Sequence, residues 1–247
     1  MTEDVPLRVE QRGPVRWLVL DRPDKKNAMT SAMGAQLGEL LEDAASDDET
    51  RVVVITGAGA AFSAGLDRDE ISRGLADKSE FPVHGLVQFE KPTIACVNGL
   101  AFGGGATMAM ACDLRVAADT ATFTFGLGRF GLTPEWGSSY LMWRQIGWSR
   151  ALDLFLTGRP VDADEALRIG LVDRVAPAAE VVDATQALAE QITALPLGTA
   201  EAMKRVLRRE LEIDFAEARE FEVEVLGERV KALRASRKKA ASKKKDG

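Results

Sequence analysis

The sequence predicts an α/β fold, in which a core of strands and helices is followed by a purely helical region. Short β-branched runs such as 51–56 and 93–97 alternate with amphipathic segments over roughly the first 175 residues. From Ala178 onward the spacing of apolar residues is that of helices alone. Three consecutive glycines, 103–105, lie where an apolar strand meets a helix-forming run, which predicts a tight turn that exposes backbone amides.

The first elements are expected between residues 15 and 56. Val15–Leu20 alternates like a strand, and Asp21-Arg22-Pro23 ends it. Thr30 or Ser31 can cap a helix whose apolar residues fall on one face. These residues are Met33, Leu37, Leu40, Leu41 and Ala44. The run 51–56 then predicts a buried strand.

A second group of elements surrounds the glycine turn. Strand 93–97 enters the turn, helix 106–111 leaves it, and strand 114–117 follows. The polar stretch from Asp67 to Glu90 lacks periodicity and predicts a mobile flap beside the site.

The remaining segments are mostly helical. Short helices are expected over 138–146 and 150–156, and Asp162 can cap another over 163–169. Leu171–Val175 predicts a strand, and helices follow over 200–211 and 215–233. We therefore expect a core over 1–196, a helical region over 197–236 and a disordered basic tail over 237–247.

Composition narrows the class of protein. The chain has 247 residues and a formal net charge of −6. Residues 228–247 carry nine Lys or Arg against two Asp or Glu, so the rest of the chain carries about −13. An acidic body argues against nucleic acid as a partner. No apolar run is long enough for a membrane span, and the acidic N-terminus is unlike a signal peptide.

Cysteine and histidine usage excludes several kinds of site. Cys96 and Cys112 lie in apolar segments, which predicts buried free thiols and a cytoplasmic protein. His84 is the only histidine, so neither a Ser-His-Asp triad nor a metal site is expected. Gly57–Phe62 matches only half of a dinucleotide fingerprint. Ala61 stands where a Gly-x-Ser-x-Gly motif around Ser63 would need glycine.

Several segments, in this order, resemble the crotonase family, which is also called the enoyl-CoA hydratase/isomerase family. They are Asp21-Arg22-Pro23 to Ala28, Phe62–Asp67, Asn98-Gly99 with Gly103–Gly105, Cys112–Ala117, and Leu152–Arg159 with Ala163–Val175. The resemblance implies a spiral of ββα units with C-terminal helices that pack subunits into a homotrimer or a hexamer. It also implies an acyl-CoA substrate, with coenzyme A entering as part of that substrate and no permanently bound cofactor.

The same resemblance implies roles for particular residues. The backbone N–H groups of Leu66 and Gly104 would bind the thioester oxygen, which gains negative charge when an enolate forms. The coenzyme A moiety would lie near Lys25, Lys26 and Ala28, with Ala64, Leu66 and the turn residue Asp67 along its path. Lysines suit the phosphates of such a ligand.

Two family positions depart from the hydratase pattern. Hydratases of the family place glutamates where this chain has Thr107 and Leu127, and hydration needs two proton-handling groups. Glu135 instead matches the glutamate of Δ3,Δ2-enoyl-CoA isomerases, a reaction for which one base suffices. We therefore expect an isomerase that acts through Glu135. A divergent hydratase and a non-catalytic acyl-CoA-binding protein remain the alternatives.

Overall fold

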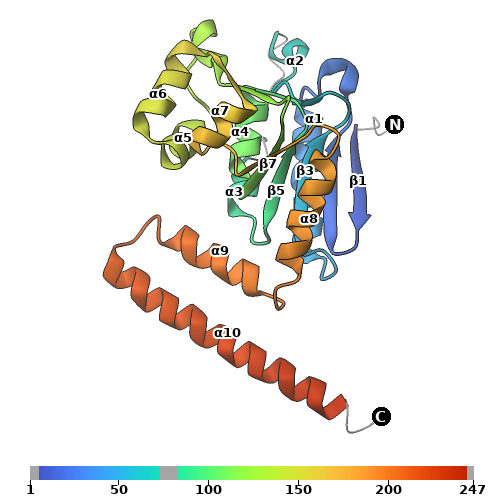
Figure 1. Ribbon diagram of the computed structural model, residues 1–247, viewed down its shortest axis with the longest axis vertical. Coiled ribbons are helices and arrows are strands. Elements are labelled where there is room, and N and C mark those ends of the chain that lie inside the picture. Colours follow the sequence, from blue (N-terminus) through green and yellow to red (C-terminus); the bar gives the residue numbers. More distant parts are fainter. Residues whose placement is uncertain (1–5, 73–82, 244–247) are drawn as a thin grey trace. The chain divides into compact units, whose positions relative to one another are not determined.

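The computed structural model describes residues 6–72 and 83–243. The chain forms two compact units that divide between Thr193 and Ala194, close to the predicted boundary after residue 196. The first unit contains the sheets with their covering helices, and the second contains two helices, α9 and α10 (Figure 1).

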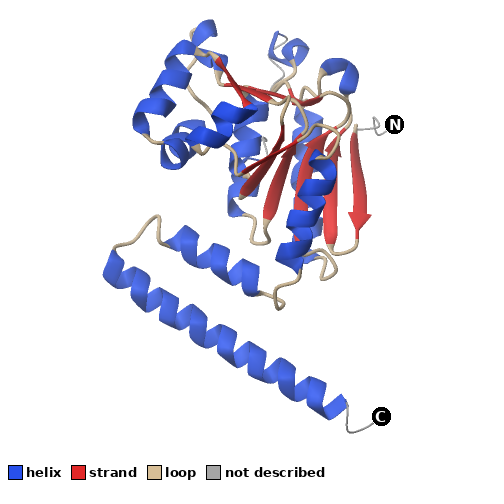
Figure 2. Ribbon diagram, viewed as in Figure 1, coloured by secondary structure: helices blue, strands red, loops and turns tan. Residues whose placement is uncertain are grey.

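The main sheet of the first unit has six strands in the order β1-β2-β3-β5-β7-β10. β1 and β2 are antiparallel, and every other neighbouring pair is parallel (Figure 2). The strands are β1 Leu7–Arg12, β2 Val15–Leu20, β3 Val52–Gly57, β5 Thr93–Val97, β7 Leu114–Ala118 and β10 Arg174–Ala176. Strands β3 and β5 are buried along their whole length, as expected for parallel strands covered on both faces.

A second, smaller sheet runs in the order β4-β6-β8-β9. Its strands are β4 Ala61–Ser63, β6 Leu100–Phe102, β8 Thr122–Thr124 and β9 Pro160–Asp162. The chain passes from one sheet to the other repeatedly, from β3 to β4, from β5 to β6 and from β7 to β8, and helices follow each pair. This alternation is the spiral of ββα units, so the predicted crotonase-like fold class is confirmed.

Helices cover both faces of the main sheet. α8 Val181–Thr193 packs across β2, β3, β5 and β7, in front of the sheet in the view of Figure 1. The other layer contains α1 Ser31–Ser46, α3 Val83–Gln88 and α4 Gly104–Ala111, which pack against one another in that order. Thr30 caps α1 as predicted, because its hydroxyl accepts from the Met33 N–H at 3.2 Å.

The other helices of the first unit are short. They are η1 Pro23–Lys25, α2 Arg68–Ser72, η2 Gly126–Phe130, α5 Ser138–Ile146, α6 Trp148–Thr157 and α7 Ala163–Ile169. The predicted cap of α7 is confirmed, because the Asp162 carboxylate accepts from the Glu165 N–H at 2.8 Å. α5 begins and ends where the sequence predicts, and α6 begins two residues earlier than predicted.

The second unit is a pair of helices, α9 Thr199–Arg209 and α10 Phe215–Lys243. Arg205 of α9 pairs with Glu228 of α10, and Arg229 donates to the Leu197 carbonyl and the Thr199 hydroxyl. α10 runs well into residues 237–247, so the expectation of a wholly disordered tail is wrong for the part up to Lys243. Lysine, arginine and alanine are strong helix formers and continue a helix that has already begun.

Two other expectations are corrected. Leu171 and Val172 do not belong to a strand: their N–H groups donate to the Ala166 carbonyl at the end of α7, and both side chains are buried. The stretch 67–90 is not irregular where the structure describes it, because it contains α2 and α3. Apolar Val83 and Leu86 anchor α3 in the core, whereas the part of the expected flap over 73–82 lies outside the described residues.

Cys96 and Cys112 are both buried free thiols, as predicted. Burial raises the pKa of the Cys96 thiol. Within residues 6–72 and 83–243, no helix is both long and apolar enough to span a lipid bilayer.

Candidate active site

The three glycines at the start of α4 are each required for a different physical reason. Gly103 has φ 53° and ψ −121°, a conformation that residues with a Cβ rarely adopt. A Cβ on Gly104 would overlap the indole ring of Trp136, and a Cβ on Gly105 would overlap the Ser63 carbonyl. The glycines therefore let two other chain segments reach the beginning of the helix.

The loop 63–67 is one of the segments that lie against this helix start. Gly65, with φ 82°, is so close that a Cβ on it would lie 3.0 Å from the Gly104 nitrogen. The loop pairs with Met29 in a single parallel bridge: Met29 N–H donates to the Gly65 carbonyl, and Asp67 N–H donates to the Met29 carbonyl. Because successive peptide groups of an extended segment point to opposite sides, the N–H of Leu66 points away from Met29.

Two backbone donors thus lie in the same neighbourhood. Gly104 is the first residue of α4, so its N–H has no partner within the helix. The positive end of the helix dipole adds to this donor. The structure therefore brings the loop that carries Leu66 to the amide of Gly104. Two backbone donors close together are the chemistry that the predicted oxyanion site requires.

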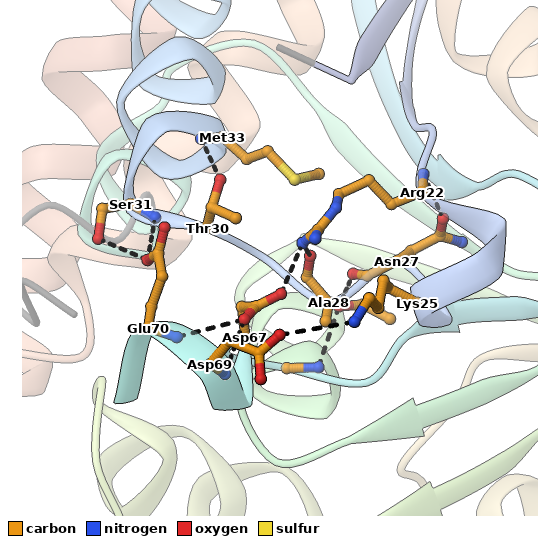
Figure 3. Close-up of polar contacts among 12 residues, drawn as sticks. Arg22, Lys25, Asn27, Ala28, Thr30, Ser31, Met33, Asp67, Asp69 and Glu70 are labelled. Atoms are coloured by element: carbon orange, nitrogen blue, oxygen red, sulfur yellow. Dashed lines mark hydrogen bonds and ion pairs between the residues drawn. The ribbon is translucent and has the colours of Figure 1, made fainter. Parts of the chain in front are cut away.

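A partly buried ion pair holds the loop 63–67 against the segment after β2. Arg22 Nη1 lies 2.9 Å from the Asp67 carboxylate and 2.7 Å from the Ala28 carbonyl (Figure 3). Burial of Asp67 opposes its ionisation, but the bonds from Arg22 and from the N–H groups of Asp69 and Glu70 outweigh it and lower its pKa. Asp67 is therefore an ionised structural anchor of this loop.

Asn27 fastens the same two segments together, and its side chain is fully buried. Its amide nitrogen donates to the carbonyls of Ala58 and Ala61 at 2.9 and 2.7 Å, and its amide oxygen accepts from the Arg22 N–H. The Ser63 hydroxyl donates to the Asn27 carbonyl at 2.8 Å. These bonds satisfy polar groups of two loops inside the core, where an unpaired group would be costly.

The residues predicted to contact coenzyme A gather around this anchor. Lys25 and Lys26 are exposed, and Lys25 Nζ lies 3.5 Å from the Asp69 carboxylate (Figure 3). Ala64 N–H donates to the Lys26 carbonyl at 2.8 Å, which joins the two predicted contact segments. At the edge of the group, Glu70 accepts from both the N–H and the hydroxyl of Ser31.

Glu135 lies in a turn with unusual backbone geometry. Trp136 and Gly137, which follow it, have positive φ values of 54° and 79°. The N–H and the hydroxyl of Ser138 both donate to the Glu135 carbonyl, at 3.0 and 2.8 Å. These bonds hold a non-glycine residue in a conformation that is unfavourable by about 1 kcal/mol or more. The turn sets the Trp136 ring on Gly104, so the residue directly after Glu135 in the chain contacts the helix start.

A small cavity of about 30 Å³ lies beside the same helix start. Thr107 and Leu127, the two positions where family hydratases carry glutamates, both line it, together with Pro134 of the Glu135 turn. Its other lining residues are Gly103, Phe125, Gly128, Leu132, Ser138 and Phe155. None of these lining residues is acidic.

A larger cavity of about 510 Å³ lies elsewhere in the first unit and shares no lining residue with the small one. Its charged groups pair with each other, since Glu10 accepts from both Arg8 and Arg12. Arg12 also stacks on the Trp17 ring, 4.3 Å from its centre. Among the described residues, no three His, Cys, Asp or Glu side chains come together as a metal ion would require.

The sequence did not predict three contacts of the site. They are the ion pair of Arg22, the buried amide bonds of Asn27 and the packing of Trp136 on Gly104. The sequence held one local signal for Asn27: an asparagine after a turn, a residue type that tolerates a positive φ. In the structure its φ is 54°. The contacts of Arg22 and Trp136 join segments far apart in the chain and leave no mark in the local pattern.

Comparison with known proteins identifies the class that this fold and site define. Residues 10–245 match the family described as enoyl-CoA hydratase/isomerase. A 4-chlorobenzoyl coenzyme A dehalogenase from Arthrobacter sp is 37% identical over 204 residues, which cover 78% of this chain and 74% of that protein. A short-chain-enoyl-CoA hydratase from Clostridium acetobutylicum is 33% identical over 228 residues, 89% of this chain and 87% of that protein.

A solved structure agrees with these matches. The crystal structure of a monofunctional enoyl CoA isomerase from M. smegmatis has a TM-score of 0.75 and 38% identity, and the match covers 87% of this chain and 97% of that one. The chain therefore belongs to the enoyl-CoA hydratase/isomerase family. It is an acyl-CoA enzyme of that family.

Proposed function

We propose that this protein moves the double bond of a 3-enoyl-CoA to the 2-position. The observation that carries the proposal is the cavity in which Thr107 and Leu127 meet beside the Glu135 turn. The two family positions that would activate water and deliver a proton lie together there, and neither has a carboxylate. Glu135 is then the group that moves the proton, which is sufficient for isomerisation.

The reaction begins when the thioester oxygen binds to the N–H groups of Leu66 and Gly104. The Glu135 carboxylate removes a proton from C2, and the resulting dienolate carries its negative charge on the thioester oxygen. Each preorganised N–H donor lowers such a barrier by about 3–4 kcal/mol. The same carboxyl group then delivers the proton to C4, and the double bond is left between C2 and C3.

Coenzyme A enters this proposal as part of the substrate. Its phosphates would lie near Lys25 and Lys26, whose exposed ammonium groups attract anions. Ala28, Ala64 and Leu66 would line the path of the pantetheine arm. The Arg22–Asp67 ion pair would hold the segment after β2 against the loop 63–67 and so keep the Leu66 amide in place.

Two alternatives are kept because specific observations favour them. A divergent hydratase is favoured by the relatives that are named as hydratases. A non-catalytic acyl-CoA-binding protein is favoured by the loss of carboxylates at Thr107 and Leu127. The three candidates differ in which acyl-CoA is turned over, so one set of assays separates them.

The test is the Glu135→Gln variant, which keeps the size of the side chain but removes its basicity. Isomerisation of a 3-enoyl-CoA should fall about 10²- to 10⁴-fold, while acyl-CoA binding measured by calorimetry stays nearly unchanged. Glu49→Gln, in the exposed turn after α1, is the matched control and should retain full activity.

Other outcomes would contradict the proposal. A Glu135→Gln variant as fast as the parent would make Glu135 an ordinary turn residue. Rapid hydration of a 2-enoyl-CoA with no isomerisation would favour the hydratase. Tight binding of acyl-CoA without turnover of either substrate would favour the binding protein.

A further inference from the structure

We infer that the acyl site of this protein accepts only short acyl groups of about four to six carbons, and that Phe155 and Trp136 set this limit. The inference rests on the proposed function for the identity of the substrate, but its physical basis is the shape of the site alone. That shape is fixed by the small cavity beside α4 and by the ring that lies on Gly104.

The volume of the cavity sets the first limit. About 30 Å³ is roughly the space of one or two water molecules, or of one or two methyl-sized groups. The cavity begins at Gly103 and Thr107, next to the amide that would hold the thioester oxygen. An acyl chain that enters it therefore has room for only a few carbons beyond the reacting atoms.

Aromatic packing forms one wall of the cavity. The rings of Phe125 and Phe155 meet edge to face, with centres 6.1 Å apart and planes at 81°. Phe125 is buried in the core, so it cannot move aside without disturbing its neighbours. Phe155 is partly buried and forms the wall that a longer chain would have to displace.

The Trp136 ring blocks a second path that an acyl chain could take. It packs directly on the Cα of Gly104, in space that a Cβ would otherwise take. The positive φ values of Trp136 and Gly137 and the bonds from Ser138 to Glu135 hold the ring there. An acyl chain cannot lie over Gly104 on this side, so it is directed into the small cavity.

The lining of the cavity also suits a short hydrocarbon chain rather than water. The Thr107 hydroxyl donates to the Gly103 carbonyl at 3.2 Å, and the Ser138 hydroxyl donates to the Glu135 carbonyl at 2.8 Å. Both hydroxyl protons are therefore used by the backbone. The rest of the side-chain lining is apolar, from Leu127, Leu132, Pro134 and the two phenylalanines.

The test compares substrates of four, six and ten carbons: 3-butenoyl-, 3-hexenoyl- and 3-decenoyl-CoA. In the parent protein, kcat/KM for the ten-carbon substrate should be at least about tenfold below that for the four-carbon substrate. Phe155→Ala removes the movable wall and should raise the ratio of ten-carbon to four-carbon kcat/KM at least about tenfold. Leu156→Ala is the matched control: the side chain is 75% exposed and does not line the cavity.

A second measurement separates this inference from the proposed function. Calorimetric dissociation constants of the saturated butanoyl- and decanoyl-CoA report the size limit without any chemistry. If no 3-enoyl-CoA is turned over but butanoyl-CoA still binds more tightly, the isomerase proposal fails and the size limit stands. Equal binding and equal turnover of short and long chains in the parent overturn the size limit.

The folding of the variant is checked by circular dichroism. If Phe155→Ala does not fold, Leu127→Ala replaces it, because this partly buried residue lines the same cavity. A folded variant that leaves the chain-length ratio unchanged overturns the assignment of that wall.

Discussion

At the scale of single residues, the Arg22–Asp67 pair links the predicted coenzyme A loop to the predicted thioester site. Asp67 is buried, and its carboxylate accepts from the Arg22 guanidinium and from two backbone N–H groups of α2. The pair is the one ionic contact shown in Figure 3 that joins the segment after β2 directly to the residue beside Leu66. Its removal is expected to loosen the Leu66 amide without touching Glu135.

We predict that Asp67→Asn lowers the free energy of unfolding by about 2 kcal/mol at pH 7, because Arg22 is left without its carboxylate. The asparagine oxygen can still accept the two N–H groups of α2. Because folding lowers the pKa of Asp67, its stabilisation is fully present above the ordinary carboxyl pKa and is lost as pH falls through the folded-state value. Urea unfolding at pH 7 and pH 3 should therefore show a difference between parent and variant that shrinks in acid.

The control is Asp69→Asn, whose side chain is 66% exposed and faces Lys25. A surface pair of this kind contributes little, so the variant should unfold like the parent at both pH values. An Asp67→Asn variant that is as stable as the parent at pH 7 would mean that the ion pair does not anchor the loop.

Roles could be assigned from the sequence to residues that lie in short family motifs occurring in a recognisable order. Leu66, Gly104 and Glu135 were singled out in this way, and their catalytic roles stay predictions. The contacts of Arg22 and Trp136 were not predicted, because their partners Asp67 and Gly104 lie many residues away in the chain. A local pattern does not encode which distant residue a side chain will meet.

At the scale of elements, the start of α4 is where the loop 63–67 and the Glu135 turn converge. Ser63, Gly65 and Trp136 all reach it, and each contact depends on the lack of a side chain at a glycine. A methyl group added at one of these glycines should therefore disturb the site even if the helix itself stays stable.

We predict that Gly104→Ala lowers kcat/KM for the acyl-CoA substrate at least about tenfold, because its Cβ overlaps the Trp136 ring and must displace it from beside Glu135. The measurement is steady-state kinetics together with the tryptophan emission spectrum. Gly38→Ala, within α1, is the control: its Cβ would meet nothing within 4 Å, so activity should be kept and stability should rise by about 0.5–1 kcal/mol. Full activity of Gly104→Ala would show that the ring moves freely.

Long, strongly patterned elements were predictable, and very short strands were not. Val15–Leu20, which alternates, and Thr93–Val97, which is a continuous apolar run typical of a buried parallel strand, were predicted with the boundaries observed. Three-residue strands such as β4 Ala61–Ser63 and β8 Thr122–Thr124 are too short to display a period. They are strands because the spiral places each of them beside β6.

At the scale of the whole molecule, the second unit presents apolar side chains that its own two helices do not cover. α9 has no buried residue. The exposed apolar residues of α9, α10 and the loop between them include Met203, Leu207, Leu211, Phe215, Val223 and Leu226. Apolar faces of this extent are typical of surfaces that pack against another subunit.

We predict that the protein is a homotrimer or a hexamer in solution. Light scattering coupled to gel filtration should give a mass three or six times the 26.7 kDa of one chain. A Leu207→Glu and Leu211→Glu double variant should reduce this mass, because charges would be buried in the interface. A parent protein that runs as a monomer at micromolar concentration would contradict the prediction.

The order of strands in the two sheets has a consequence for how the polypeptide is made. In both sheets each new strand joins the edge formed by an earlier one, so the spatial order follows the order of synthesis. No strand has to be inserted between two that are already paired. The sheets can therefore grow from one edge while the chain leaves the ribosome, and each added strand covers the edge that the previous strand exposed.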